Sequence, residues 1–202
     1  MDPITLLLLL ALGAYGLNWR DQKQRIALLG SQLGQYQIES LMEQLTQGYL
    51  RALGEDDADR RAQIWNLLGT TELALCEQFN RFATEFGQLP EAETRVSKLA
   101  LVPLLRQLVP GLTFDMRQAL RIHAQGITRA AENRLNLPLK NKAFILSAEL
   151  FLMQHSCHWF CRSKTVASAR MLMRHQTTHA QLITAVSDET RQAYCALTGA
   201  TK

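Results

Sequence analysis

The sequence predicts an all-α protein, with a single helical-bundle domain preceded by an N-terminal transmembrane or membrane-anchoring helix. Apolar residues recur at intervals of three and four through most of the chain, which is the period of a helix with one buried side. No segment shows a convincing strand pair or hairpin turn. Residues 4–17 form an uncharged and almost wholly apolar run, which is the strongest single feature of the sequence.

The composition is that of a folded globular chain. Its 202 residues are 47% hydrophobic, a content that excludes an intrinsically disordered chain. The 11 glycines and 5 prolines are too few for a collagen-like or low-complexity chain. The sequence contains neither an internal repeat nor a linker that would separate two domains. We therefore expect a membrane anchor over residues 1–19 and one helical domain over residues 20–202.

The apolar run at residues 4–17 reads ITLLLLLALGAYGL. Extended through Trp19 it is about 25 Å long as a helix, just short of the roughly 30 Å hydrocarbon core of a bilayer. Tyr15, Trp19 and Arg20 are the expected membrane-interface anchors, because aromatic and basic side chains concentrate at the boundary between lipid and water. The positive charges that follow the run predict a single-pass membrane protein, with the N-terminus outside and the bulk of the chain in the cytoplasm.

Two alternatives remain open for this run. A cleaved signal peptide would have small residues such as Ala11 and Gly13 before its cleavage site, but the segment before the run lacks the usual positive charge. A buried core helix is the other alternative, since apolar runs of this length are common in protein cores. The chain has only 4 cysteines and no disulfide framework, which favours a reducing compartment.

The first half of the domain reads as two long helices and the start of a third. The amphipathic helix expected over about 19–53 ends at Gly54, and the acidic residues at 55–59 begin a helix to about residue 86, because carboxylates stabilise a helix N-terminus. Pro90 begins another helix, which Pro103 bends or breaks and Pro110 ends. The apolar residues that define the 19–53 helix are Ile26, Leu29, Leu33, Ile38, Leu41, Leu45, Tyr49 and Leu53.

The bundle is expected over about 55–200, and its most buried helix lies in the second half of the chain. Thr113 is expected to cap a helix to about residue 135, and a turn at 136–138 follows. Residues 143–153 are apolar on nearly every side, which is typical of a central helix. The pattern allows two helices over 141–162 and 164–186, joined near Ser163, or one continuous helix. A last helix is expected from Ser187 to Gly199.

Charge is distributed unevenly along the chain. Residues 1–93 carry a net charge of −6 and residues 94–180 a net charge of +10. One interpretation is that the acidic and basic elements pack against each other or form solvated faces. The other is that the basic segment binds anionic lipid, nucleic acid or an acidic partner. Single-stranded nucleic acid is not favoured, because residues 115–143 contain no aromatic side chain for stacking on bases. The residues expected on an anion-binding surface are Arg117, Arg121, Arg129, Arg134, Lys140 and Lys142.

Six of the nine cysteines and histidines lie within residues 155–179. The series Cys157-x3-Cys161-x13-His175-x3-His179 resembles the C2H2 zinc finger, and this resemblance implies a tetrahedral zinc site with those four ligands. The helical pattern gives the alternative interpretation, in which these are small or polar positions on buried helices. Two helices joined near Ser163 place Cys161 and His175 about 15 Å apart, which is too far for one ion.

The sequence contains none of the motifs that mark phosphate-binding loops, zinc proteases or serine hydrolases. The leading hypothesis is a membrane-anchored accessory or scaffold protein that docks partner proteins at the cytoplasmic face of a membrane and uses no cofactor. The alternative is a metal-binding or nucleic-acid-binding regulator, which would use the Cys/His cluster at 155–179 and the basic segment at 94–180. An all-helical enzyme of another kind remains open.

Overall fold

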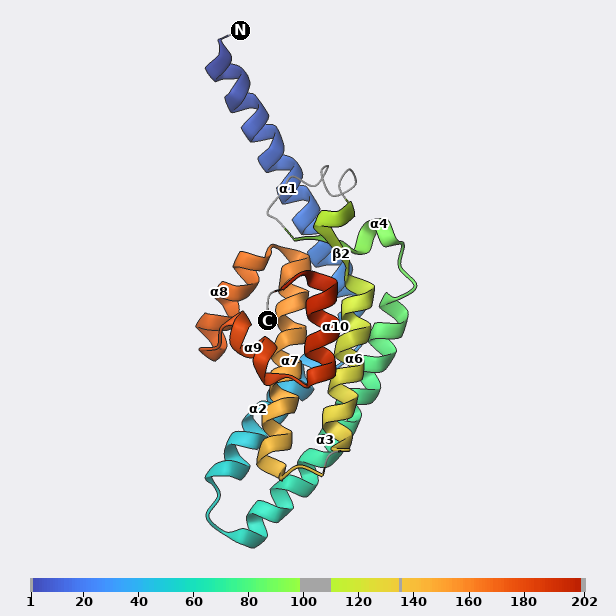
Figure 1. The fold of residues 1–202 in the computed structure, drawn as a ribbon, viewed down its shortest axis with the longest axis vertical. Helices are drawn as coiled ribbons and strands as arrows, with labels where there is room; N and C mark the ends of the chain where they lie inside the picture. Colours follow the sequence, from blue (N-terminus) through green and yellow to red (C-terminus); the bar gives the residue numbers. More distant parts are fainter. Residues whose placement is uncertain (1, 99–109, 135, 201–202) are drawn as a thin grey trace.

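The computed structural model describes residues 2–98, 110–134 and 136–200. The described chain is almost wholly helical and contains one two-stranded sheet. Figure 1 shows an elongated bundle, with the N-terminal part of α1 projecting from one end of it. The prediction of an all-α bundle is confirmed.

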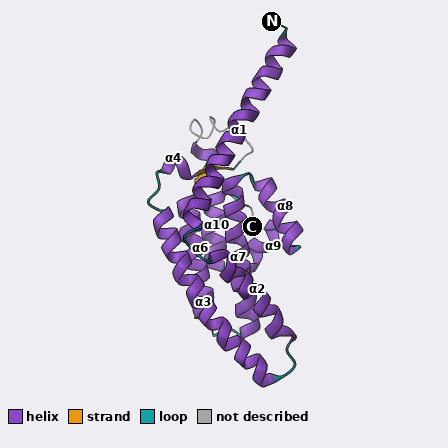
Figure 2. Ribbon diagram, turned by 180° about the vertical axis from the view of Figure 1, so that it is seen from behind, coloured by secondary structure: helices purple, strands orange, loops and turns teal. Residues whose placement is uncertain are grey.

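Helix α1 (Pro3–Leu33) has two parts that differ in burial. Residues 2–20 are exposed except for Ala14, which is half-buried, whereas Arg25 and Leu29 are buried against the bundle. Both views show the exposed part standing clear of the other helices (Figures 1 and 2). No helix in the described ranges has the length and apolar character of a membrane-crossing segment.

The single helix predicted over about 19–53 is two helices in the structure. Helix α1 ends at Leu33, and α2 (Ile38–Gly54) begins after a short turn. Gly34 lies in this turn and donates its backbone N–H to the Gly30 carbonyl, which closes the last turn of α1. Ile38 and Leu41 continue the apolar pattern across the break because both are buried in the same core. The periodicity therefore predicted most of the buried face and missed the turn, but Ile26 and Leu53 are exposed.

Helix α3 (Ala58–Phe86) packs against α2 and α6. It begins as predicted, with the Asp57 carboxylate accepting a hydrogen bond from the Arg60 backbone N–H. Its buried face carries Phe79, Phe82 and Phe86, whose neighbouring ring centroids are 5.7 Å apart. These aromatic side chains form the centre of the main core.

A small antiparallel sheet follows α3 and corrects the expectation of a chain without strands. After α4 (Glu91–Thr94), strand β1 (Arg95–Ser97) pairs with β2 (Thr113–Asp115), so that Val96 lies opposite Phe114. A single turn of 3-10 helix (Pro110–Leu112) precedes β2. Three-residue strands are too short to show an alternating pattern in the sequence. The bend expected at Pro103 lies outside the described residues.

The central helix of the bundle is α7 (Leu139–Cys161), as the sequence predicts. It contacts α1, α2, α6 (Met116–Glu132), α8 (Lys164–His175) and α9 (His179–Ala185). Asp115, and not Thr113, caps α6, because the Asp115 carboxylate accepts a hydrogen bond from the Arg117 N–H. The helix expected over 164–186 is divided between α8 and α9, because Gln176 adopts a left-handed conformation and Thr178 begins a capping box.

The last helix, α10 (Asp188–Thr198), follows the prediction closely. The Ser187 side chain accepts a hydrogen bond from the Thr190 N–H at its start, and Gly199 ends it with a φ of 70°. A positive φ is a conformation that glycine adopts without strain, which explains the choice of residue there. Helix α10 packs on α6, so the C-terminal region closes the bundle over the α6–α7 pair.

Two leucines of α3 provide a matched test of the core. Leu75 is 0% exposed and Leu73 is 66% exposed. We predict that Leu75→Ala lowers the free energy of unfolding by about 2–5 kcal/mol, because it leaves a cavity, and that Leu73→Ala changes it by less than about 0.5 kcal/mol. Chemical denaturation of the two variants measures the difference, and equal effects would contradict this placement of α3.

Candidate functional site

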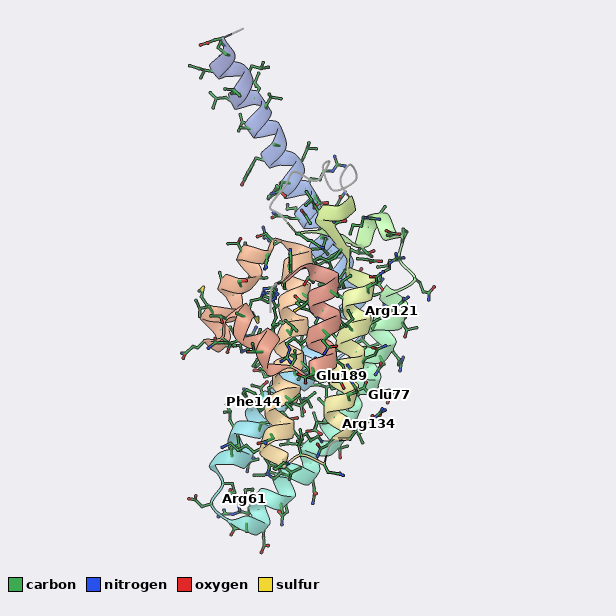
Figure 3. All side chains as sticks on the ribbon, viewed as in Figure 1. Arg61, Glu77, Arg121, Arg134, Phe144 and Glu189 are labelled. Carbon is green, nitrogen blue, oxygen red and sulfur yellow. The ribbon has the colours of Figure 1, made fainter. Side chains whose placement is uncertain are left out.

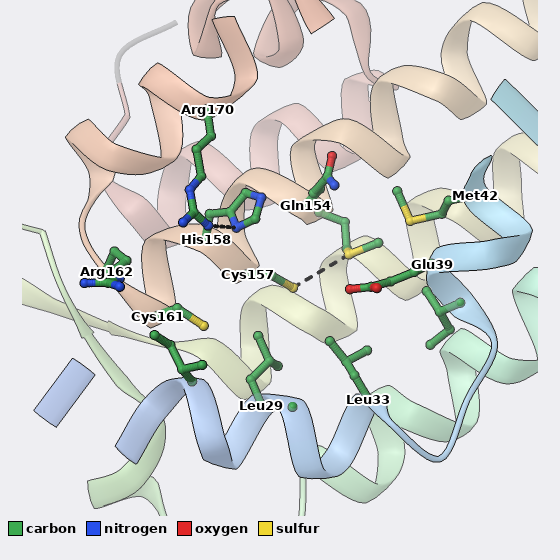
Figure 4. Close-up of a pocket in the computed structure, with 14 residues that line it drawn as sticks. Leu29, Leu33, Glu39, Met42, Gln154, Cys157, His158, Cys161, Arg162 and Arg170 are labelled. Carbon is green, nitrogen blue, oxygen red and sulfur yellow. Dashed lines mark hydrogen bonds between the residues drawn. The ribbon is translucent and has the colours of Figure 1, made fainter. Parts of the chain in front are cut away.

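A pocket of about 310 Å³ lies where α1, α2, α7 and α8 meet (Figure 4). Its walls are mainly apolar, and its floor contains the buried side chains of Leu29, Met42 and Met153. Gly30 also lines the pocket and leaves open space where a larger residue would place a side chain. The other apolar lining residues are Ile26, Leu33, Ile38, Cys157 and Cys161.

Charged and polar side chains occupy two edges of this pocket. At the α8 edge, Arg170 donates a hydrogen bond from Nη1 to Nδ1 of His158, with 3.2 Å between the nitrogens. Burial and the Arg170 charge lower the pKa of His158, so its ring is a neutral acceptor. Arg162 is at the same edge and Glu39 comes from α2 on the other side (Figure 4). One edge is therefore cationic and the opposite edge carries a carboxylate.

The two thiols of the pocket are poor nucleophiles. Cys157 lies 3.7 Å from the Met153 sulfur, and burial raises the pKa of its thiol. Burial also raises the pKa of Cys161 to about 11, although neighbouring arginines oppose that shift. The thiolate is the reactive form of cysteine, so both residues are protonated and unreactive near neutral pH. Their contribution to the pocket is apolar surface.

A second cluster, formed by histidines, lies inside the bundle. The rings of His155 and His179 are stacked, with 4.0 Å between centroids and 15° between planes. Nε2 of His155 is 3.1 Å from Ser168 Oγ, and Nε2 of His179 is 3.2 Å from Tyr194 Oη. The edge of the cluster is closed by Trp159, which makes T-shaped contacts with both histidines. These contacts join α7, α8, α9 and α10.

The cluster continues to α6 through His123. Its Nε2 is 2.8 Å from Ser156 Oγ, and its ring lies 5.6 Å from the Tyr194 ring. Burial is the main cause of the low pKa values in this cluster, which are about 3 for His123, about 2 for His155 and about 4 for His179. All three histidines are therefore neutral at pH 7. His123 and His155 are enclosed by the core and His179 is half-buried, and in the described structure their contacts connect helices.

The four residues of the zinc-finger pattern are not brought together. Cys157 and Cys161 line the pocket, whereas His175 bonds to Gln154 with 3.0 Å between Nε2 and Oε1, and His179 belongs to the histidine cluster. Over residues 2–98, 110–134 and 136–200 the structure contains no group of three or more His, Cys, Asp or Glu side chains arranged to hold a metal. Helices α7 and α8 occupy the segment in which a zinc finger would have its hairpin.

Three of the six basic residues expected to bind anions form ion pairs within the molecule. Arg117 is 2.7 Å from the Asp115 carboxylate, and Arg134 is 2.5 Å from that of Glu132. Lys142 pairs with Glu72, which is itself buried and accepts a hydrogen bond from Tyr49 Oη at 2.6 Å. The Glu72–Lys142 pair joins the acidic first part of the chain to the basic second part.

The other three basic residues, Arg121, Arg129 and Lys140, differ in exposure. Arg129 is partly buried and donates to Thr190 Oγ1 at 3.4 Å. Arg121 and Arg134 lie on the outer surface of the bundle (Figure 3), while Lys140 is exposed at the start of α7. The expectation that these residues bind an anionic surface remains a prediction.

Glu149, a carboxylate on the central helix, makes polar contacts that were not predicted from the sequence. Glu149 Oε1 accepts hydrogen bonds from the Ser187 backbone N–H at 3.1 Å and from its hydroxyl at 2.8 Å. Burial raises the Glu149 pKa. A side chain at Gly126 would begin 2.4 Å from Glu149 Oε2, so only glycine fits there. A carboxylate inside an otherwise apolar helix was the signal in the sequence for such a contact.

The pocket was also missed, although its residues left a trace in the sequence. Met153, Cys157 and Cys161 are spaced by four residues and therefore share one face of α7. The identity of the facing helix cannot be read from that spacing, because the turn at 34–37 brings α1 and α2 to the pocket from different directions.

Comparisons of the chain with protein-family models, curated proteins and solved structures find no match.

The buried histidines predict a loss of stability in mild acid. Their pKa values are lower in the folded chain than the ordinary value of 6.5, so the unfolded chain binds more protons below that pH. Each histidine lowers the free energy of unfolding by up to about 1.4 kcal/mol per pH unit as the pH falls from 6.5 toward 4. Urea denaturation at pH 7, 6 and 5 measures this change, and equal stability at all three would contradict the burial of these rings.

We further predict that removal of metal leaves the fold unchanged. A structural zinc site contributes about 10–16 kcal/mol to the folding of zinc-finger peptides, so its loss would be evident. Here the stability comes from packed helices, and the melting temperature should be the same with and without a chelator. A stoichiometric zinc ion that is lost together with the fold in Cys157→Ala or His179→Ala would contradict this prediction and restore the finger interpretation.

Proposed function

We propose that the chain is a membrane-anchored helical accessory protein, attached to lipid by the apolar part of α1 and docking partner proteins with its bundle. The observation that carries this proposal is the exposure of the anchor segment, residues 3–19. Leu7 is 66% exposed and Leu10 is 62% exposed, although both belong to a run of leucines. In the ranges that the structure describes, the bundle does not cover that surface.

The size of this apolar surface supports lipid as the environment. Burying one large apolar side chain contributes about 1.5–3 kcal/mol, and extended apolar patches on proteins mark sites of interaction with partners or membranes. The large apolar residues exposed on the anchor segment are Ile4, Leu6, Leu7, Leu8, Leu9, Leu10, Leu12, Tyr15, Leu17 and Trp19. They surround the helix on all sides, as insertion into hydrocarbon requires.

The boundary of the anchor segment has the chemistry of a membrane interface. Lys23 places its ammonium group 3.8 Å from the centroid of the Trp19 ring, and Arg20 is exposed beside them. Aromatic and basic side chains are favoured at the level of the lipid headgroups. The bundle would then begin just beyond the headgroups, and under the positive-inside rule it faces the cytoplasm.

Partner docking is the second part of the proposal. Apolar side chains are exposed toward the end of the bundle where α2 passes into α3, which is the end away from the anchor segment (Figure 1). Such residues are enriched in protein interfaces when they lie together. The candidates are Leu50, Leu53, Leu67, Leu139 and Phe144, and Figure 3 labels Phe144 on this part of the surface.

We predict that lysines in the anchor segment abolish lipid binding. Each lysine at the centre of a membrane helix costs about 2.5–3.5 kcal/mol, so Leu7→Lys with Leu10→Lys should reduce the bound fraction at least a hundredfold. The matched control is Leu67→Lys with Leu73→Lys, because these leucines are exposed on α3. Flotation of the full chain with phosphatidylcholine–phosphatidylglycerol vesicles measures binding. Equal flotation of the two double variants would contradict the proposal.

The orientation is tested separately in cells. A reporter fused to the C-terminus should be active on the cytoplasmic side, and residues 3–19 should be present in the mature protein. A mature N-terminus near Ala14 together with an extracytoplasmic C-terminus would show that the segment is a signal peptide. That result would contradict both the anchor and docking at the cytoplasmic face of the membrane.

A further inference from the structure

The pocket between α1, α2, α7 and α8 has the properties of a binding site for a small amphiphile. Its volume of about 310 Å³ lies at the lower end of the range for ligand sites, which is about 300–1,000 Å³. A volume at that end of the range is suited to one alkyl chain of medium length.

The walls of the pocket select an apolar chain. Leu29 and Leu33 from α1 face Cys157 from α7 across the pocket, and Met42 from α2 closes one end (Figure 4). Met153 also lines the pocket, with its sulfur 3.7 Å from that of Cys157. The two pocket cysteines are protonated and so add no charge to this wall. Methionine side chains adapt their shape to flexible apolar ligands. A sugar or nucleotide would lose hydrogen bonds to water along these walls without replacing them.

The charges at the pocket edges orient such a ligand. Arg170 and Arg162 stand at the α8 edge, while Glu39 stands at the α2 edge and repels an anion from that end (Figure 4). Arg170 is exposed, and its guanidinium has five N–H donors, of which one at Nη1 bonds to His158. Arginine binds carboxylates through paired hydrogen bonds. An anionic head is therefore favoured at Arg170, with the chain running toward Met42.

We propose that this pocket binds a medium-chain fatty acid, with its alkyl chain between α1 and α7 and its carboxylate at Arg170. This binding does not depend on membrane attachment, because none of the lining residues belongs to the anchor segment. The ligand needs only one chain and one negative charge. Decyl phosphate carries the same chain with a different head, so it distinguishes a free fatty acid from a lipid phosphate.

The test uses the full chain and a decanoate derivative that carries a diazirine near the end of its alkyl chain. After photolysis, mass spectrometry of the peptides should find the label on residues 26–42 and 153–161. An excess of unlabelled decanoate should remove this label while labelling of residues 3–19 persists. Label confined to residues 3–19, or label in the pocket that decanoate does not displace, would overturn the proposal.

Two variants separate occupation of the pocket from general adhesion to apolar surface. Gly30→Leu adds a large side chain at a residue that lines the pocket, and nothing within 4 Å obstructs its first side-chain atom. It should reduce pocket labelling at least tenfold. The control is Gly69→Leu on α3, where nothing lies within 4 Å either, and it should leave labelling unchanged. Equal labelling of the two variants would contradict a site at this pocket. Competition by unlabelled decanoate tests the same site in the unsubstituted chain.

The anionic head is tested at Arg170. Arg170→Gln should weaken decanoate binding about tenfold, since hydrogen bonds to charged groups are the strong ones, and should leave binding of decanol unchanged. The control is Arg174→Gln, because Arg174 is exposed on the same helix and does not line the pocket. Equal binding of decanol and decanoate, or stronger binding of decyl phosphate, would overturn the assignment of a fatty acid.

Discussion

The bundle depends on α7, a helix buried on nearly every side that nevertheless contains several polar side chains. Glu149, His155 and Ser156 are all 0% exposed, and buried polar groups are stable only when they are hydrogen-bonded. Their partners come from other helices: Ser187 before α10, Ser168 on α8 and His123 on α6. Apolar burial draws these helices toward α7, and the polar contacts select one arrangement among the possible ones.

Among the described residues, the same arrangement leaves the anchor segment and the pocket as apolar surfaces on which α1 contributes side chains. The anchor segment of α1 extends beyond the last helix that could cover it, and the pocket remains where α1 bends away into α2. Both surfaces lie on one helix, since residues 26–33 of α1 line the pocket and residues 3–19 form the anchor segment. The proposed lipid attachment and the proposed ligand binding would thus use opposite ends of α1. The Arg25 side chain, which donates hydrogen bonds to the Phe160 and Arg95 carbonyls, holds the helix between them.

Helix periodicity and capping residues were sufficient to predict most of the fold. The buried face of α2, the Asp57 start of α3, the central position of α7 and the limits of α10 all follow from local sequence. The break at Gly34 was missed because the apolar pattern continues through it. The short sheet was missed because its stability comes from distant packing, in which Phe114 lies on Trp159 with 4.9 Å between ring centroids.

The candidate site was less predictable than the fold, because a pocket depends on which helices meet. The cysteines and histidines that lie close together in the sequence separate in the structure into a pocket, a stacked pair and a partly buried contact with Gln154. Hydrogen exchange of the full chain tests the two-part organisation most directly. The account predicts slow exchange in α7 with or without vesicles, and exchange at residues 3–19 that is fast in water and slow with vesicles. Protection of residues 3–19 that is the same with and without vesicles would contradict it.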